Sequence, residues 1–106
     1  MAVTLSVTKG PAKGKVFTFT EHDTFLFGRM PDCHATFPDD TQVSRHHFIL
    51  EACPPKASLR DLGSLNGTFV NGKKITKQAL ADGDKIQISS STIFKFALQD
   101  LSLIHI

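Results

Sequence analysis

The chain has 106 residues, of which 41% are hydrophobic and 21% charged, a composition that fits one globular domain and excludes a disordered or fibrous chain. Its formal net charge is only +2, and Lys and Arg form no run longer than Lys73-Lys74, so nucleic-acid binding is not indicated. There is no apolar stretch of about 18 residues and no signal-peptide pattern, so we expect a cytoplasmic protein without membrane contact. Cys33 and Cys53 show neither disulfide nor zinc-ligand spacing, and we expect no metal and no cofactor.

The first part of the chain predicts a series of short strands. Apolar or β-branched residues alternate with polar ones in bursts, which is the pattern of strands with one buried face. Turn residues interrupt the bursts at Pro31-Asp32 and at Pro54-Pro55, and a proline pair cannot continue a hydrogen-bonded ladder. The expected strands cover residues 3–7, 16–20, 24–27, 35–37, 47–52 and 57–61.

The later part of the chain contains two Asn-Gly pairs. Asn71-Gly72 predicts a tight hairpin between strands at 68–70 and 73–75, because both residues tolerate positive φ. The other expected strands are 85–88 and 92–98. No window shows a helical period over three turns, so the pattern predicts an all-β antiparallel sandwich or barrel.

Three motifs lie next to predicted strands. They are Gly28-Arg29, Ser44-Arg45-x-His47 and Asp61-x-x-Ser64-x-Asn66-Gly67-Thr68-x-x-Asn71-Gly72. In this order and spacing they resemble the forkhead-associated (FHA) domain, a phosphothreonine-binding module, and strand-like flanks extend the resemblance to about residues 3–98. The resemblance implies an antiparallel β-sandwich of two twisted sheets, of the eleven-stranded type, with binding loops at one end.

The resemblance assigns phosphate recognition to the first two motifs. A phosphothreonine carries about −1.5 to −2 charge and three acceptor oxygens, so its site needs fixed donors and a permanent cation. Arg29 supplies a guanidinium that can bind phosphate bidentately, and Ser44 supplies a hydroxyl and a backbone N–H. Arg45 is expected to add a contact to the phosphate or to the peptide around it. Gly28 and His47 are expected to support the site, His47 through internal hydrogen bonds.

The third motif is expected to position the peptide. The resemblance implies that Asn66 holds the backbone of the ligand just after the phosphothreonine. Ser64 either hydrogen-bonds within its loop or reaches the phosphate. Some relatives carry a hydroxyl residue where this chain has Leu65, so that contact is either missing or made by a backbone N–H. The remaining supports of the site are Gly67, Thr68, Asn71 and Gly72, with Thr68 and Asn71 expected to hold the hairpin.

The implied function is phosphothreonine-dependent recognition of a peptide or protein in Ser/Thr kinase signalling of the bacterial type. We expect no catalytic activity, no nucleic-acid or membrane binding, and a monomer. The expected partner is a phosphorylated protein, which could be a Ser/Thr kinase in cis or in trans. The alternative is an FHA fold that binds its partner without phosphate.

Two other interpretations of the same residues are weaker. Ser44, His47 and Asp61 have the residue types of a hydrolytic triad, but Ser44 lies in no nucleophile-elbow pattern and no oxyanion loop is apparent. A metal site would have to combine residues that lack recognised ligand spacing, namely Cys33, His34, His46, His47 and Cys53. We therefore expect a binding module rather than an enzyme or a metalloprotein.

The last six residues, Leu101-Ser102-Leu103-Ile104-His105-Ile106, match the translation of a transposon adapter used in sequencing libraries. We expect the FHA domain to cover residues 1–100 and residues 101–106 to be a non-native read-through tail. The genomic locus tests this expectation, because a gene that encodes these six residues and then stops would refute it.

Overall fold

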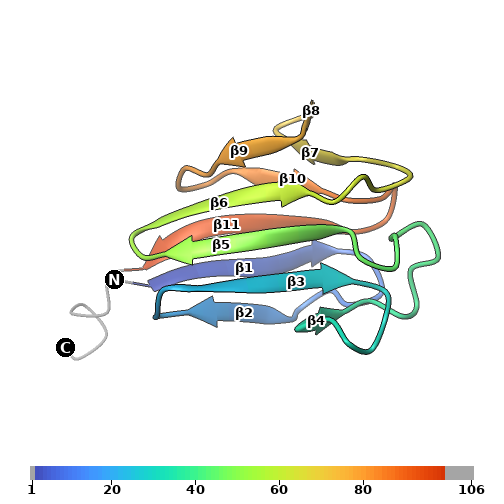
Figure 1. Cartoon of the computed structure of the whole chain (residues 1–106), viewed down its shortest axis with the longest axis horizontal. Coiled ribbons are helices and arrows are strands. Elements are labelled where there is room, and N and C mark those ends of the chain that lie inside the picture. Colours follow the sequence, from blue (N-terminus) through green and yellow to red (C-terminus); the bar gives the residue numbers. More distant parts are fainter. Residues whose placement is uncertain (1, 100–106) are drawn as a thin grey trace.

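The computed structural model describes residues 2–99, so the expected tail at 101–106 lies outside the described residues. Within residues 2–99 the chain forms eleven strands in two sheets that face each other, which confirms the all-β sandwich (Figure 1). The first sheet has the order β2 (Val16–Phe19), β1 (Ala2–Lys9), β11 (Ile93–Gln99), β10 (Lys85–Gln87), β7 (Thr68–Val70) and β8 (Lys73–Ile75). The second has the order β4 (Ala35–Thr36), β3 (Asp23–Gly28), β5 (Phe48–Cys53), β6 (Lys56–Asp61) and β9 (Lys77–Ala79).

The core lies between the two sheets and is rich in phenylalanine. Strand β5 shows how the sequence builds it, because Phe48, Leu50 and Ala52 point inward and are fully buried while Ile49 and Glu51 face the other side. The rings of Phe27 and Phe48 stack at a centroid distance of 4.6 Å, and Phe94 of the opposite sheet meets both edge-on. Burying one such side chain contributes about 1.5–3 kcal/mol, so these rings hold the sheets together.

The observed strands differ from the predicted ones in two places. Strand β9 was not predicted, because all three of its residues are exposed at a sheet edge and show no apolar alternation. Strand β4 pairs with β3 in parallel, whereas the sequence predicts antiparallel pairing. The chain leaves β3, turns through residues 29–34 and comes back beside the last two residues of β3, Phe27 and Gly28, so both strands run in one direction. The Asn71-Gly72 hairpin is confirmed, with φ values of 52° and 83°.

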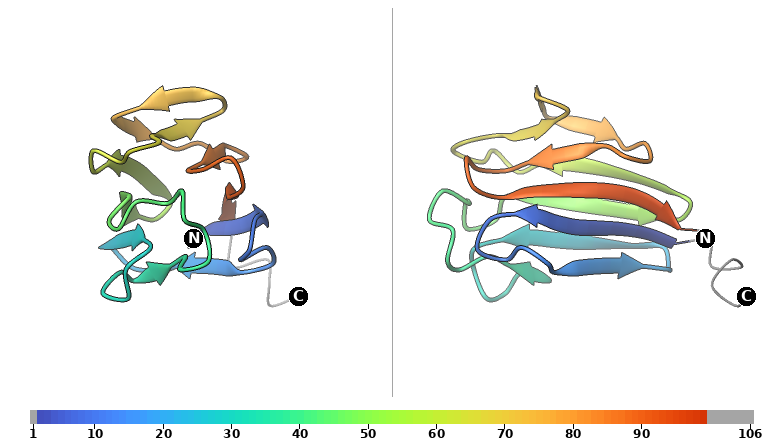
Figure 2. Two further views of the ribbon diagram at one scale, coloured as in Figure 1. Left: turned by 90° about the vertical axis from the view of Figure 1, so that its right-hand side faces the viewer. Right: turned by 180° about the vertical axis from the view of Figure 1, so that it is seen from behind.

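Three loops gather at one end of the sandwich, at the right of Figure 1 and facing the viewer in the left view of Figure 2. They are the β3–β4 loop (29–34), the β4–β5 loop (37–47) and the β6–β7 loop (62–67). The first residues of β1 pair with the last residues of β11 at the opposite end, where Ala2 faces Gln99. Among residues 2–99 no helix has the length and hydropathy that a membrane crossing requires.

Candidate functional site

An open hollow of about 400 Å³ lies where the β3–β4, β4–β5 and β6–β7 loops meet. Its lining includes the side chains of Arg29, Ser44 and Arg45. A larger hollow of about 470 Å³ lies beside β2 and β3, but phenylalanines dominate it and no Lys or Arg lines it. Of these two hollows, the smaller one has the arginine side chains that suit an anionic ligand.

Arg29 is fixed through its backbone and leaves its side chain free for a ligand. Its N–H donates to the carbonyl oxygens of Ser44 and Arg45, both at 3.1 Å, so the β3–β4 loop is tied to the β4–β5 loop. Its side-chain Nε is buried and has no hydrogen-bond partner among the described residues. A buried cationic donor without an acceptor is unfavourable, so an anion bound in the hollow would complete it.

Gly28 allows the close approach of these two loops. A Cβ atom at this position would lie 2.2 Å from the carbonyl oxygen of Arg45, a distance that no side chain can adopt. The absence of a side chain at Gly28 thus sets the position of the neighbouring Arg29.

His47 joins the β4–β5 and β6–β7 loops from beneath. Its Nδ1 accepts a hydrogen bond from the backbone N–H of Ser44 at 3.1 Å, and its Nε2 donates to the carbonyl oxygen of Gly67 at 2.9 Å. This pairing requires a neutral ring with its proton on Nε2. Burial of the ring lowers the pKa of His47, which keeps it neutral. Because the ring contacts the N–H of Ser44 and not the hydroxyl, the geometry of a hydrolytic triad is not formed.

Ser44 and Leu65 connect the upper parts of the same loops. The backbone N–H of Leu65 donates to the hydroxyl oxygen of Ser44 at 3.0 Å. Ser44 keeps its hydroxyl hydrogen for another acceptor. The side chain of Leu65 is 88% exposed and lies along the hollow, where it offers apolar surface in place of a hydroxyl.

Asp61 organises the β6–β7 loop. Its carboxylate accepts hydrogen bonds from the N–H groups of Gly63 and Ser64 and from the hydroxyls of Ser64 and Thr68. Burial raises the pKa of Asp61, but these donors outweigh burial and the net pKa is lowered. The hydroxyl of Ser64 is therefore engaged within its own loop. The side chain of Thr68 also serves this loop rather than the hairpin, contrary to the expectation from sequence.

Asn66 is held in place by Gln42, a residue that lies outside the three motifs. Its side-chain NH₂ donates to the backbone carbonyl oxygen of Gln42 at 2.8 Å. The side-chain oxygen of Gln42 in turn accepts from the N–H and the hydroxyl of Ser90, at 2.9 and 2.8 Å. Asn66 is exposed, and its amide oxygen remains available as an acceptor.

Asp40 is a buried anchor that the sequence did not reveal. Only 5% exposed, it accepts hydrogen bonds from the hydroxyls of Ser89 and Thr92 and from the N–H of Gln42. Burial raises the pKa of Asp40, but the hydrogen bonds from the two hydroxyls and the N–H of Gln42 act together against burial, and the net pKa is lowered. In the sequence Asp40 follows Pro38-Asp39 and has the appearance of an ordinary turn residue. The β4–β5 loop is thus fastened to the loop between β10 and β11.

Asn71 fastens the β7–β8 hairpin to the neighbouring strand. Its side-chain NH₂ donates to Asp84, and its oxygen accepts from the N–H of Lys85, both at 3.0 Å. Gly72 follows it with positive φ, as the tight turn requires.

A family model described as the FHA domain matches residues 25–89, which is more than half of the chain. The chain belongs to the FHA domain family. The curated relatives that this FHA domain matches include an oxoglutarate dehydrogenase inhibitor of Corynebacterium jeikeium, 39% identical over 79% of the chain and 57% of the relative. The glycogen accumulation regulator GarA of Mycolicibacterium smegmatis is also 39% identical, over 79% of the chain and 52% of the relative. The chain therefore spans just over half the length of these relatives.

The fold of this FHA domain is similar to solved structures of the family. One of them comes from a structural and functional analysis of phosphothreonine-dependent FHA domain interactions. It is 34% identical, with a TM-score of 0.82, and the match covers 95% of this chain and 100% of that chain. The residues that bring Arg29 and Ser44 to one hollow thus lie in a fold that matches this solved FHA structure over almost the whole chain.

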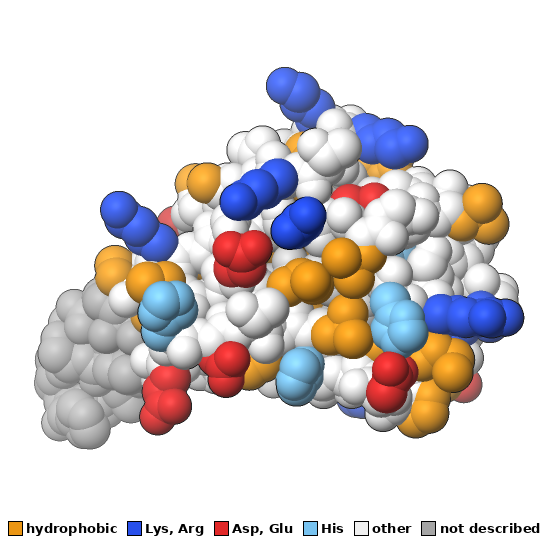
Figure 3. All heavy atoms as spheres, viewed as in Figure 1, with side chains coloured by type: hydrophobic (Ala, Val, Ile, Leu, Met, Phe, Trp, Pro, Cys, Tyr) orange, Lys and Arg blue, Asp and Glu red, His pale blue; other side chains and the backbone are white. Residues whose placement is uncertain are grey.

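Charge is distributed unevenly around the loop end of the FHA domain. The carboxylates of Asp40 and Asp61 point into the loops and are occupied by donors, whereas Arg29 and Arg45 line the hollow. On the face seen in Figure 3, Lys and Arg side chains are interrupted by acidic and uncharged ones. The hollow therefore suits a small, compact anion better than an extended polyanion.

Proposed function

We propose that this FHA domain recognises phosphothreonine-containing segments of proteins in Ser/Thr kinase signalling, with the phosphate bound in the hollow beside Arg29. The observation that carries the proposal is that Arg29 lines a hollow shared with Ser44, while its buried Nε has no partner among the described residues. A phosphate supplies the negative charge and the several acceptor oxygens that this arrangement lacks.

Each loop contributes one element of recognition. Arg29 binds the phosphate through its guanidinium, and Ser44 donates its hydroxyl hydrogen to a second phosphate oxygen. Arg45 lies exposed at the rim and adds charge where the peptide enters. Ser64 and Leu65 shape the opposite wall, Ser64 by its bond to Asp61 and Leu65 by its exposed side chain.

Asn66 holds the peptide on the far side of the phosphothreonine. Its amide is already oriented by Gln42, and Gln42 is oriented by Ser90, so little conformational entropy is lost when a peptide binds. Gly28, His47, Gly67, Thr68, Asn71 and Gly72 support these loops without touching the ligand. The stiff sandwich beneath them keeps the donors in place before binding.

The domain acts by binding in the cytoplasm and carries out no chemical step of its own. Its relatives are named as an inhibitor and a regulator, which supports a regulatory role rather than a catalytic one. The partner is a protein phosphorylated by a Ser/Thr kinase, or such a kinase in cis or in trans, and the domain works as a monomer.

A peptide library tests the proposal. The chain is offered degenerate peptides that carry phosphothreonine, phosphoserine or unmodified threonine, and the affinity is measured for wild type, Arg29→Ala and Arg60→Ala. Arg60 is an exposed arginine on β6 and serves as the matched control. We expect binding of phosphothreonine peptides alone, weakened about thirtyfold or more by Arg29→Ala and unchanged by Arg60→Ala, since losing one partner of a buried charged pair costs about 2 kcal/mol or more. Binding that ignores phosphate and Arg29 would establish the phosphate-independent alternative.

A further inference from the structure

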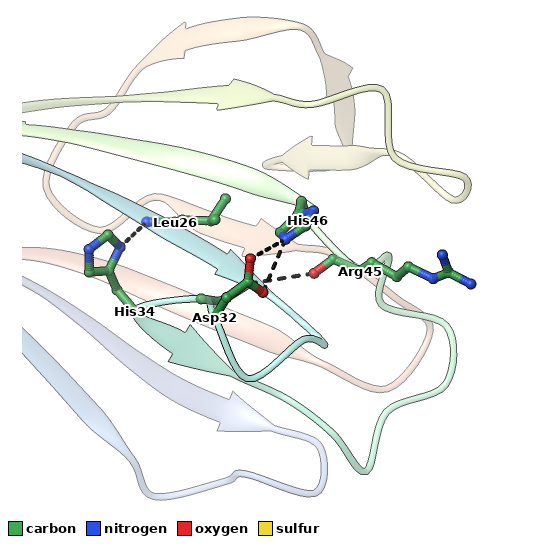
Figure 4. A network of polar contacts seen from close by, with 6 residues as sticks. Leu26, Asp32, His34, Arg45 and His46 are labelled. Carbon is green, nitrogen blue, oxygen red and sulfur yellow. Dashed lines mark hydrogen bonds and ion pairs between the residues drawn. The ribbon is translucent and has the colours of Figure 1, made fainter.

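Three potential metal ligands meet beside the loop end, where the β3–β4 and β4–β5 loops touch (Figure 4). They are a carboxylate oxygen of Asp32, Sγ of Cys33 and Nε2 of His46, and all lie within 4.8 Å of one another. Nε2 of His46 is 2.9 and 3.1 Å from the two carboxylate oxygens of Asp32. Among residues 2–99 this is the only such group of three.

The local structure places these atoms together before any ligand binds. The N–H of Cys33 donates to the carbonyl oxygen of Met30 at 3.1 Å, which closes a tight turn and presents Asp32 and Cys33 side by side. Sγ of Cys33 lies 3.4 Å from the carbonyl oxygen of Arg45, the residue before His46. Gly28 leaves space for the sulfur, because a Cβ there would lie 3.0 Å from it.

We propose that Asp32, Cys33 and His46 form a binding site for a divalent transition-metal ion of the zinc class, with a solvent molecule as the fourth ligand. Zinc is bound in proteins by thiolate, imidazole and carboxylate at about 2.0–2.3 Å, which places the ligand atoms about 3.3–3.7 Å apart in a tetrahedron. The three atoms need only small shifts to reach that arrangement. The cysteine thiol loses its proton when the metal binds, and this proton is released to solvent.

The donor set argues against other ions and other roles. Magnesium and calcium prefer oxygen ligands, and only Asp32 supplies them here. Cys33 has no disulfide partner among residues 2–99, because the other cysteine, Cys53, ends β5 at the opposite end of the sandwich. The exposed ion pair between Asp32 and His46 contributes only about 0–1 kcal/mol to stability. This small contribution does not account for the buried sulfur of Cys33 beside the pair.

The metal would bridge the two loops that carry Arg29 and Ser44. Asp32 and Cys33 belong to the loop that begins with Arg29, and His46 follows Ser44 by two residues. The side chain of Arg45 points away from Asp32 and His46 in Figure 4, so a bound metal leaves it available. His46 also lines the hollow beside Arg29, so the metal site adjoins the proposed phosphate contacts and shares their scaffold. Sequence reasoning set a metal site aside because its candidate ligands lack recognised spacing, and Asp32 was not among those candidates.

Titration of the reduced full chain with Co²⁺ tests the site. We expect one equivalent to bind with a thiolate-to-cobalt charge-transfer band and a tetrahedral d–d spectrum, both displaced by Zn²⁺. Cys33→Ser and His46→Ala should abolish the band and weaken affinity by more than about a hundredfold, since even changes around metal ligands cost about 10–100-fold. Cys53→Ser and His22→Ala change an exposed cysteine and an exposed histidine elsewhere and should leave the spectrum unchanged.

Thermal unfolding with and without Zn²⁺ provides a second readout. Zinc should raise the unfolding temperature of wild type and Arg29→Ala equally, and not that of His46→Ala, because binding to the native state stabilises it. The variant Cys33→Ser keeps a donor for the carbonyl of Arg45 and should fold normally. Absence of the charge-transfer band, or its persistence in Cys33→Ser, would overturn the proposal.

Discussion

Nε2 of His47 lies 2.9 Å from the carbonyl oxygen of Gly67, although the two residues are twenty positions apart in the chain. Through this bond and its bond to the N–H of Ser44, one buried ring fixes two loops at once. The hydrogen-bonding capacity of the neutral imidazole is fully used. Recognition by this FHA domain therefore depends on a residue that no ligand needs to touch.

Replacement of His47 by Ala should lower both stability and phosphopeptide affinity. It leaves the N–H of Ser44 and the carbonyl of Gly67 without partners, and each costs about 1–3 kcal/mol when buried. We expect the free energy of unfolding in urea to fall by about 3 kcal/mol or more. The neighbouring His46→Ala, at an exposed position, should change it by less than about 1 kcal/mol. Equal midpoints for the two variants would show that His47 is not a structural link.

Acid should destabilise the fold in two steps. The pKa of His47 is lowered in the folded state, so the unfolded state takes up its proton first as the pH falls through about 6.5, and stability is lost from there downward. The pKa values of Asp40 and Asp61 are also lowered, so the stability they contribute is complete above about 3.8 and is lost below it.

Urea unfolding at a series of pH values checks the first step. The free energy of unfolding should change by at most about 1.4 kcal/mol per pH unit. This pH dependence should be missing in His47→Gln, whose side chain does not titrate. The other histidines are present in both proteins and cancel in the comparison. If the pH dependence persists in His47→Gln, it comes from one of the other histidines.

Substitution of Gly28 by Ala should be far more damaging than that of Gly72. The new Cβ at Gly28 would lie 2.2 Å from a backbone carbonyl oxygen, so the loop must move, at a cost of about 3 kcal/mol or more. At Gly72 a Cβ meets nothing within 4 Å. The only cost there is that of holding alanine at a positive φ of 83°, about 1–2 kcal/mol. Denaturation midpoints compare the two, and Gly28→Ala should also lose phosphopeptide affinity. Similar midpoints would mean that the two loops are free to separate.

Asp61 should matter more for binding than Ser64. Asp61→Ala removes the acceptor of four hydrogen bonds that shape the β6–β7 loop, whereas Ser64→Ala removes one donor to the same carboxylate. We expect phosphopeptide affinity to fall about tenfold or more for Asp61→Ala and severalfold at most for Ser64→Ala. Titration calorimetry measures both. A larger loss for Ser64→Ala would indicate that its hydroxyl leaves Asp61 to contact the phosphate.

Leu65→Thr should strengthen phosphopeptide binding. The side chain is 88% exposed beside the hollow, so the change costs the fold little, and a threonine hydroxyl there could donate to the phosphate. A hydrogen bond to a charged group contributes about 1.5–3 kcal/mol, so we expect affinity to rise about tenfold, with Leu65→Ala as the control without a hydroxyl. Unchanged affinity for both variants would place the phosphate out of reach of residue 65.

The parts of the fold that alternate clearly in sequence were predicted correctly. The strand expected at 47–52 and the positive-φ turn at Asn71-Gly72 both come from local patterns, which a sequence displays directly. Strand β9 was missed because Lys77, Gln78 and Ala79 are all exposed, so no buried face marks it. The parallel direction of β4 depends on how the chain returns to β3, which no local pattern encodes.

The candidate site was predicted less completely than the fold. The three motifs place Arg29, Ser44 and Asn66 near one another, but what holds them comes from distant residues. Thr92 bonds to Asp40 across 52 positions, and Ser90 bonds to Gln42 across 48. Short polar side chains in turns are common, so neither pair stands out before the sheets bring them together.

The pairing of Ala2 with Gln99 puts both ends of the described chain at the same end of the sandwich. Strand β1 has eight residues, so it carries the chain about 26 Å toward the loops at about 3.3 Å per residue. A fluorescent protein or an affinity tag fused before residue 2 would therefore sit far from Arg29 and leave the hollow open. The same geometry suits immobilisation on a sensor surface, where every molecule would present its recognition loops outward.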